Sequence, residues 1–324
     1  MNLYLFKRGG TYLLVFAVAL AVNFFLPRAI PGNPIEELGT SVGSLSVQMD
    51  PSTLEALKRY YGLDLPVTAQ FRNYLTGMVR GDLGYSISHR IPVSRLLVER
   101  FPWTLFLTLS ALGISFTVAL VLGTRAGLRR GKEWGVLAPA VILESMPPFV
   151  LGSLLLILFS VKIPVFPLSG AYSTFSGLTG VERALDLAHH AALPVLVLAA
   201  SGFFPAYLVV RSSVLMVQDE PYVLMAEMKG LPEKTIRIRY VLRNALLPVV
   251  TFFGLRLASS AGGAILVEVL FAYPGIGRLI YEAVLSHDYP LLQGAFLAFT
   301  LWVLLVNFCT DCLYVSLDPR VKEV

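Results

Sequence analysis

The sequence predicts an all-α membrane protein with about six transmembrane helices. Hydrophobic residues make up 56% of the 324 residues and charged residues only 15%, whereas soluble domains carry about 25% charged residues. The mean hydropathy of +0.69 is too high to come from one anchor, because a single span needs only about 20 apolar residues. The apolar residues also lie in long runs separated by short basic loops. We therefore expect a chain that crosses the membrane several times.

The first apolar run, at about residues 12–26, follows Lys7 and Arg8. It could be a signal peptide or a first span, and the bulky residues after it leave no small-residue cleavage site, so we expect an uncleaved span. Each of the later runs is long enough to cross a hydrocarbon core of roughly 30 Å. These runs lie at about 101–124, 134–161, 188–210, 246–271 and 290–315.

The distribution of basic residues predicts the topology. Lysine and arginine are dense in the loops at 125–133 and 211–245 and recur in the C-terminal tail, but they are sparse in the other short loops. Because short loops rich in Lys and Arg stay in the cytoplasm, both termini are expected there, and the long polar segment 31–99 is expected outside. The expected organisation is an N-terminal span in 1–30, the extracytoplasmic segment 31–99, a transmembrane domain at 100–315 and a cytoplasmic tail at 316–324.

Prolines and small residues indicate kinked, closely packed spans. Proline inside a span is tolerated where neighbouring helices or water satisfy the freed carbonyl groups. The prolines within the predicted spans are Pro139, Pro147, Pro148, Pro194, Pro205 and Pro248. The run from Ser259 to Ala264 contains only small residues, which favours the close approach of another helix.

Four ionisable residues lie inside the predicted spans: Glu144, Arg256, Glu268 and Asp311. A charge at the bilayer centre costs about 2.5–3.5 kcal/mol on insertion scales, so each needs a partner or water. Glu144 precedes Pro147 and Pro148, where a bent helix could expose its carboxylate to an aqueous cavity. The alternative is a structural ion pair with Arg256. Glu268 and Asp311 lie nearer to span ends, where hydration is easy. The candidates for lining a translocation pathway are Glu144, Arg256 and Glu268.

No motif for covalent chemistry or for a metal site is apparent. Cys309 and Cys312 lie in an apolar run and fit two small hydrophobic residues of a packed helix. The four histidines, His89, His189, His190 and His287, do not have the spacing of a ligand cluster. The sequence also lacks a phosphate-binding Walker A motif. We therefore expect no catalytic residue, metal or cofactor in this chain, and any ATP would be bound by another protein.

A short cytoplasmic helix is predicted between Asp219 and Pro232. Acidic residues and a proline precede it, and glycine and proline follow it, which delimits about two helical turns. Its apolar side chains need to be buried, either by a partner protein or in the membrane interface. The residues expected on its exposed face are Tyr222, Met225 and Ala226, with Leu224 and Met228 beside them.

The segment PYVLMAEMKGLPEKTIRIRYVLRNALLPVVT (221–251) resembles the coupling loop of permeases from ATP-binding-cassette importers, specifically of the oligopeptide and dipeptide permease family. The resemblance extends in order over nearly the whole chain. Its further motifs are GNP (32–34), YGLDLP (61–66), GDLGYS (81–86), PPFVLG (147–152), VEVLFAYPGIGRLI (267–280), HDYPLLQG (287–294) and DPR (318–320).

The resemblance implies a six-span fold in which a coupling helix between the fourth and fifth spans docks in a groove of an ATPase subunit. Carried onto this sequence, the docking positions are Tyr222, Val223, Leu224, Met225, Ala226, Lys229 and Gly230. The family usually has Arg-Thr-Ala-Arg-Ala-Lys-Gly where this chain has LMAEMKG at 224–230, so two basic residues are missing. A less acidic ATPase groove is therefore expected.

The resemblance also implies partners and a location. The expected partners are a second, homologous permease, two ATPase subunits that hold ATP and Mg²⁺, and an extracytoplasmic solute-binding protein, all at a bacterial or archaeal cytoplasmic membrane. Peptides are the leading substrates, although relatives of the family carry glutathione-like compounds, nickel complexes or some sugars. Two alternatives are an ion-coupled secondary transporter that uses Glu144, Glu268 or Asp311 as relay groups, and a membrane scaffold without transport activity.

Overall fold

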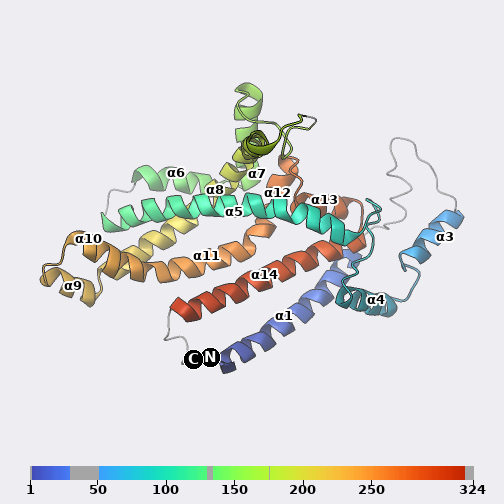
Figure 1. Ribbon diagram of the computed structural model, residues 1–324, viewed down its shortest axis with the longest axis horizontal. Coiled ribbons are helices and arrows are strands. Elements are labelled where there is room, and N and C mark those ends of the chain that lie inside the picture. Colours follow the sequence, from blue (N-terminus) through green and yellow to red (C-terminus); the bar gives the residue numbers. More distant parts are fainter. Residues whose placement is uncertain (1, 30–50, 130–133, 175, 318–324) are drawn as a thin grey trace. The chain divides into compact units, whose positions relative to one another are not determined.

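The computed structural model describes residues 2–29, 51–129, 134–174 and 176–317, and Figure 1 labels their helices. All regular secondary structure in these residues is helical, and the only β-type pairing among them is an isolated bridge between Tyr85 and Pro92. The predicted all-α class is therefore confirmed. The expected features that fall within 30–50, 130–133 and 318–324 lie outside the described residues.

Helices long and apolar enough to cross a membrane correspond to five of the six predicted spans. In the described residues these stretches are Gly9–Ala29, Val93–Leu128, Gly180–Gln218, Glu233–Ser260 and Tyr289–Cys312. Several extend beyond the apolar runs because their polar ends continue the helix, as in α5 (Val93–Leu128) and α8 (Gly180–Gln218). As expected for membrane helices, Pro194 and Pro205 lie inside α8 without ending it.

The predicted span at 134–161, expected to bend at its prolines, is divided into separate helices in the structure. Helix α6 (Trp134–Ser145) ends before Pro147, and a new helix, α7 (Pro148–Leu156), continues into a π-helical turn, η1 (Ile157–Lys162). Pro147 has an extended backbone with φ −54° and ψ 138°, because the residue before a proline is disfavoured in the α-helical region. Pro148 then starts α7 at a position where its missing N–H group costs nothing.

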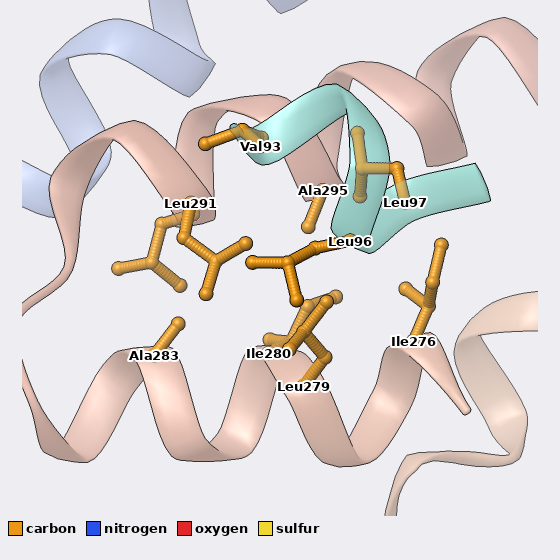
Figure 2. Packing of buried hydrophobic residues seen from close by; sticks show 10 residues of the cluster. Val93, Leu96, Leu97, Ile276, Leu279, Ile280, Ala283, Leu291 and Ala295 are labelled. Carbon is orange, nitrogen blue, oxygen red and sulfur yellow. The ribbon is translucent and has the colours of Figure 1, made fainter. Parts of the chain in front are cut away.

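The chain forms two compact units, and unit 1 comprises Met1–Trp103 and Gly275–Leu304. Its helices are α1 (Asn2–Ala29), α3 (Pro51–Tyr60), α4 (Val67–Val79), α13 (Ile276–Leu285), the start of α5 and the first part of α14 (Tyr289–Leu317). Helix α13 places Ile276, Leu279, Ile280 and Ala283 at helical spacing on one face. Figure 2 shows this face packed against the first turns of α5 and of α14, which makes the core of the unit.

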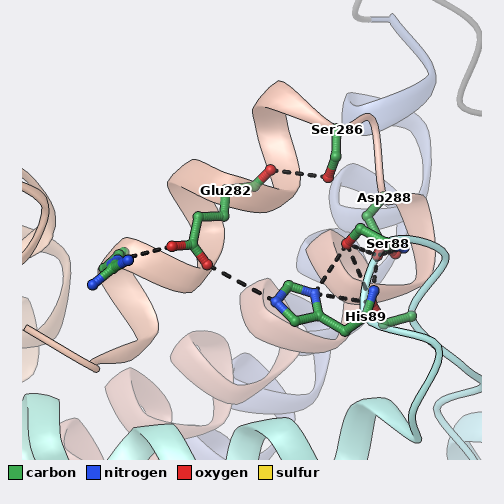
Figure 3. Close-up of polar contacts among 7 residues, drawn as sticks. Ser88, His89, Glu282, Ser286 and Asp288 are labelled. Atoms are coloured by element: carbon green, nitrogen blue, oxygen red, sulfur yellow. Dashed lines mark hydrogen bonds and ion pairs between the residues drawn. The ribbon is translucent and has the colours of Figure 1, made fainter. Parts of the chain in front are cut away.

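Two of the motifs quoted above, GDLGYS and HDYPLLQG, meet in unit 1 at Asp288. The carboxylate of Asp288 is fully buried and accepts hydrogen bonds from Ser86 Oγ at 2.6 Å and from Ser88 N and Oγ at 2.9 and 2.8 Å, as Figure 3 shows for Ser88. Its second oxygen accepts from the backbone N–H of Leu291 at 3.1 Å and thereby caps the start of α14. One side chain therefore fixes the loop before α5 to α14.

Unit 2 comprises Thr104–Pro274 and Leu305–Val324. Helix α8 is its centre and packs against α6, α7, α11 (Arg243–Gly263) and α12 (Ile265–Leu270). Helix α5 also lies very close to α8. A Cβ atom added to Gly123 would lie 2.9 Å from the side chain of Val210, and one added to Gly127 would lie 2.7 Å from the side chain of Val214. These two glycines form a GxxxG pattern, the arrangement that lets two membrane helices touch.

Two expectations about packing differ from the structure. In the small-residue run at 259–264, Ala264 is buried, but Gly262 has open space beside it, and the side chains of 261 and 263 lie outside the described residues. Cys309 and Cys312 are free and exposed on α14 rather than packed. The surfaces of this single chain that remain open at these places are therefore left to lipid or to another subunit.

Candidate functional site

A cavity of about 330 Å³ lies in unit 2 among α5, α8, α11 and the break between α6 and α7. Its walls combine apolar side chains with hydroxyl groups and two opposite charges. The polar side chains that line it are Thr108, Ser115, Glu144, Ser201, Arg256, Ser259 and Ser260. Such a mixed lining inside apolar helices is typical of a path for a polar solute.

Glu144 reaches this cavity because the chain is broken just behind it. The residue lies in the last turn of α6, before the extended backbone at Pro147, and its side chain is exposed to the cavity. Its carboxylate therefore lines the cavity at the point where the helix is broken.

Arg256 lines the same cavity from α11. Its guanidinium lies 5.4 Å from the centre of the Phe252 ring, so that an aromatic face supports part of the charge. The alternative of a structural ion pair between Glu144 and Arg256 is not seen in the described part of the chain, although both side chains line one cavity.

Glu268 occupies a different place from these two residues. It is fully buried in α12 and accepts a hydrogen bond from Thr104 Oγ1 at 2.6 Å, and it is not among the residues that line the cavity. The expectation of an easily hydrated span end was wrong for this residue, because α12 packs against α7 and α8. Asp311 is half-buried on α14.

The sequence analysis did not identify Ser115 as a residue that lines the cavity. Its side chain is only 2% exposed, and its Oγ has no hydrogen-bond partner in the described structure, yet it lines the cavity. Thr108, another lining residue, lies seven positions earlier on the same face of α5. This two-turn spacing of hydroxyl groups in an apolar helix is the signal that could have identified Ser115.

The short helix predicted between Asp219 and Pro232 is present as α9 (Pro221–Met228). Pro221 occupies the first helical position, where proline is favoured. At the other end Gly230 has φ +68°, and the N–H groups of Gly230 and Leu231 donate to the carbonyls of Glu227 and Ala226. This is a Schellman motif, which needs glycine at the left-handed position.

The side chains of α9 divide into an inner and an outer face. Val223 and Ala226 are buried against the chain's own α8, η2 (Ile236–Leu242) and α11. The prediction that Ala226 shares the exposed face was therefore wrong, because it lies three residues after Val223 on the same inner face. The apolar residues of α9 that stay exposed are Tyr222, Leu224, Met225 and Met228.

The inner face ties α9 to the membrane helices. The buried cluster joins Val223 and Ala226 to Val214 of α8 and to Ala245 of α11, and Tyr222 Oη accepts a hydrogen bond from Asn244 Nδ2 at 3.1 Å. A force on the outer face would therefore be transmitted to α8 and α11, and both of these helices also line the cavity. The remaining residues predicted to dock on an ATPase, Lys229 and Gly230, are exposed after the last turn of α9.

Comparison with known proteins identifies the family. Residues 119–323 match the binding-protein-dependent transport system inner membrane component family, and residues 1–108 match the N-terminal region of such membrane components. The chain is 35% identical to a di/tripeptide transport system permease protein of Pseudomonas aeruginosa, over 98% of each chain.

Two further relatives are similar over almost their whole length. One is a dipeptide transport system permease protein of Escherichia coli, 33% identical over 99% of this chain and 98% of the relative. The other is an oligopeptide transport system permease protein of Bacillus subtilis, 30% identical over 99% of this chain and 100% of the relative. The chain therefore belongs to the family of inner membrane components of binding-protein-dependent transport systems, the permease subunits of ATP-binding-cassette importers.

Proposed function

We propose that this chain is one of two permease subunits of an importer for peptides, driven by ATP hydrolysis in two partner ATPase subunits and supplied by an extracytoplasmic solute-binding protein. The observation that carries this proposal is full-length similarity to permeases named for di-, tri- and oligopeptides. The cavity in unit 2 supports the proposal as a candidate solute site, and the exposed side chains of α9 support it as a candidate contact for an ATPase.

In this proposal the membrane is crossed six times. Helices α6, α7 and η1 together form a broken third span, because each part alone is shorter than the roughly 20 residues that a span requires. Both termini and α9 then face the cytoplasm of a bacterial or archaeal cell, and α3 and α4 face outside. Glu144 lies just before the break in this span and lines the cavity of unit 2.

The alternation of access would depend on the connection between α9 and the spans. Closure of the ATPase dimer would move α9, and the buried contacts of Val223 and Ala226 would carry the movement to α8 and α11. The chain itself would hold neither ATP nor Mg²⁺. An ion-coupled transporter would leave the exposed apolar face of α9 without a purpose.

The assembly of an active ATPase tests this proposal. The purified chain alone should hydrolyse no ATP, and its assembly with the partner permease and ATPase subunits in lipid nanodiscs should give hydrolysis that rises when peptide-loaded binding protein is added. Hydrolysis by the chain alone, or a complex that does not respond to the loaded binding protein, would count against the proposal.

A further inference from the structure

The cavity in unit 2 contains one carboxylate and one guanidinium that do not pair with each other in the described structure. We propose that these two groups bind the charged ends of a zwitterionic solute, with Arg256 receiving the carboxylate of a short peptide and Glu144 its ammonium group. This inference rests on the proposed function, because it assumes that the cavity is part of the route that the peptide takes.

Opposite charges in one membrane cavity need an explanation. A charge within a membrane span is costly and is usually offset by a partner of opposite sign or by water. Here the two candidates for mutual neutralisation line the same space without forming an ion pair in the described residues. A solute that carries both charges would satisfy both side chains at once, whereas a neutral sugar or a simple ion would satisfy at most one.

The chemistry of each side chain matches one end of a peptide. The planar guanidinium of Arg256 presents a fork of N–H donors that fits a carboxylate with two parallel hydrogen bonds. Its position over the Phe252 ring limits the directions in which it can point. The carboxylate of Glu144 has only acceptor atoms when ionised and fits an ammonium group with three N–H donors.

The hydroxyl groups that line the same cavity fit the backbone of a peptide. Ser201, Ser259 and Ser260 each donate to a carbonyl of their own helix, so their oxygen lone pairs remain available to accept from a peptide N–H. Ser115 Oγ is buried without a partner in the described structure. A Cβ atom on Gly202 would lie 3.2 Å from that oxygen, so the glycine leaves room at this hydroxyl group.

The size and the lining of the cavity indicate that it would not recognise the side chains of a peptide. A volume of about 330 Å³ is at the lower end of the roughly 300–1,000 Å³ that ligand pockets have, which suits a short peptide. The rest of the lining is apolar and includes Leu112, Phe116, Met146 and Leu198. These walls tolerate many side chains, so the cavity would select for free termini rather than for peptide sequence.

The test measures ATP-driven uptake into proteoliposomes by the complete transporter with three substrates: a free dipeptide, the same dipeptide with a C-terminal amide, and its N-acetyl derivative. Arg256→Gln should lower uptake of the free dipeptide at least about tenfold, because a charged hydrogen-bonded contact is lost, and should change uptake of the amide far less. Glu144→Gln should likewise lower uptake of the free dipeptide and should change uptake of the N-acetyl derivative, which lacks the ammonium group, far less. For each substrate, uptake by the variant is divided by uptake by the unsubstituted transporter. The binding protein is the same in both measurements, so its preference among the three substrates does not affect this ratio.

Two further variants keep the result interpretable. Arg256→Lys retains the charge but loses the fork, so it should still favour the amide over the free dipeptide relative to the unsubstituted transporter, by a smaller factor than Arg256→Gln. Arg183→Gln removes a charge on α8 that does not line the cavity, and it should affect all three substrates equally. Equal losses for free and amidated dipeptide in the Arg256 variants would overturn the inference. An unsubstituted transporter that imports no peptide with ATP would instead overturn the proposed function.

Discussion

The outer face of α9 predicts a measurable contact with the ATPase subunits. Met225 and Met228 lie three residues apart on this face and are 60% and 80% exposed. Full burial of a methionine side chain contributes about 1.5–3 kcal/mol, so covering the exposed parts of both would contribute about 2–4 kcal/mol. The double variant Met225→Ala/Met228→Ala keeps only the Cβ methyl groups and should lose about 2 kcal/mol, or roughly 30-fold in affinity for the ATPase.

The assay titrates fluorescently labelled ATPase subunits onto the permease pair in nanodiscs and measures uptake with the same preparations. Affinity is the appropriate readout, because the partner permease would supply a second contact and could keep the complex assembled. The control is Leu185→Ala, which removes a side chain that is 65% exposed near the N-terminal end of α8. ATPase affinity of the double variant within about threefold of the control, a difference of under 1 kcal/mol, would refute docking by this face and favour an interfacial membrane helix.

The methionine double variant is a better test than a substitution of Ala226, because Ala226 is buried. A glutamate at this position would place an unpaired carboxylate among the side chains that hold α9 to α8 and α11, at a cost of several kcal/mol. Loss of transport in Ala226→Glu would then report damage inside this chain. The exposed methionines avoid this difficulty because neither belongs to the buried cluster that holds α9 to α8 and α11.

Three other predictions concern stability and topology. Gly127→Ala should lower the free energy of unfolding of the detergent-solubilised protein by about 1–3 kcal/mol through overpacking against α8, whereas Gly113→Ala, on the same helix with open space around it, should not destabilise. Asp288→Ala should lower it by about 1–3 kcal/mol, because buried donors lose their acceptor; an unchanged melting temperature would contradict the capping role. In a background without native cysteines, Arg72→Cys should react with an impermeant thiol reagent in intact cells and Lys234→Cys should not; the reverse pattern would invert the topology.

Much of the fold could be predicted because its signals are local. Long apolar runs mark the spans, and proline at the first position of α9 with Gly230 after its end marks that helix. The break at Pro147 was visible as a kink but not as the end of a helix, because hydropathy averages over a window and does not register backbone geometry. The GxxxG contact at Gly123 and Gly127 depends on which face of α5 meets α8, and this is decided by tertiary packing.

The candidate site could be predicted only in part for the same reason. Glu144 and Arg256 are more than a hundred positions apart, and only the packing of α8 against α6 and α11 brings them to one cavity. Like Glu144 and Arg256, Glu268 is an ionisable residue within a predicted span, but it lies in the short helix α12 and is buried there, where it accepts a hydrogen bond from Thr104. The inner and outer faces of α9 were assigned incorrectly at Ala226, since periodicity defines a face but does not tell which face meets the chain's own helices.

The most direct test of the central claim is the energy source of uptake. The complete transporter should be reconstituted in proteoliposomes, with the binding protein outside and ATP or an ion gradient as the only variable, and the import of a labelled dipeptide should be measured. Import should require enclosed ATP and Mg²⁺ together with the binding protein, and it should not change when proton and sodium gradients are collapsed. Import driven by an ion gradient in the absence of ATP would contradict this prediction.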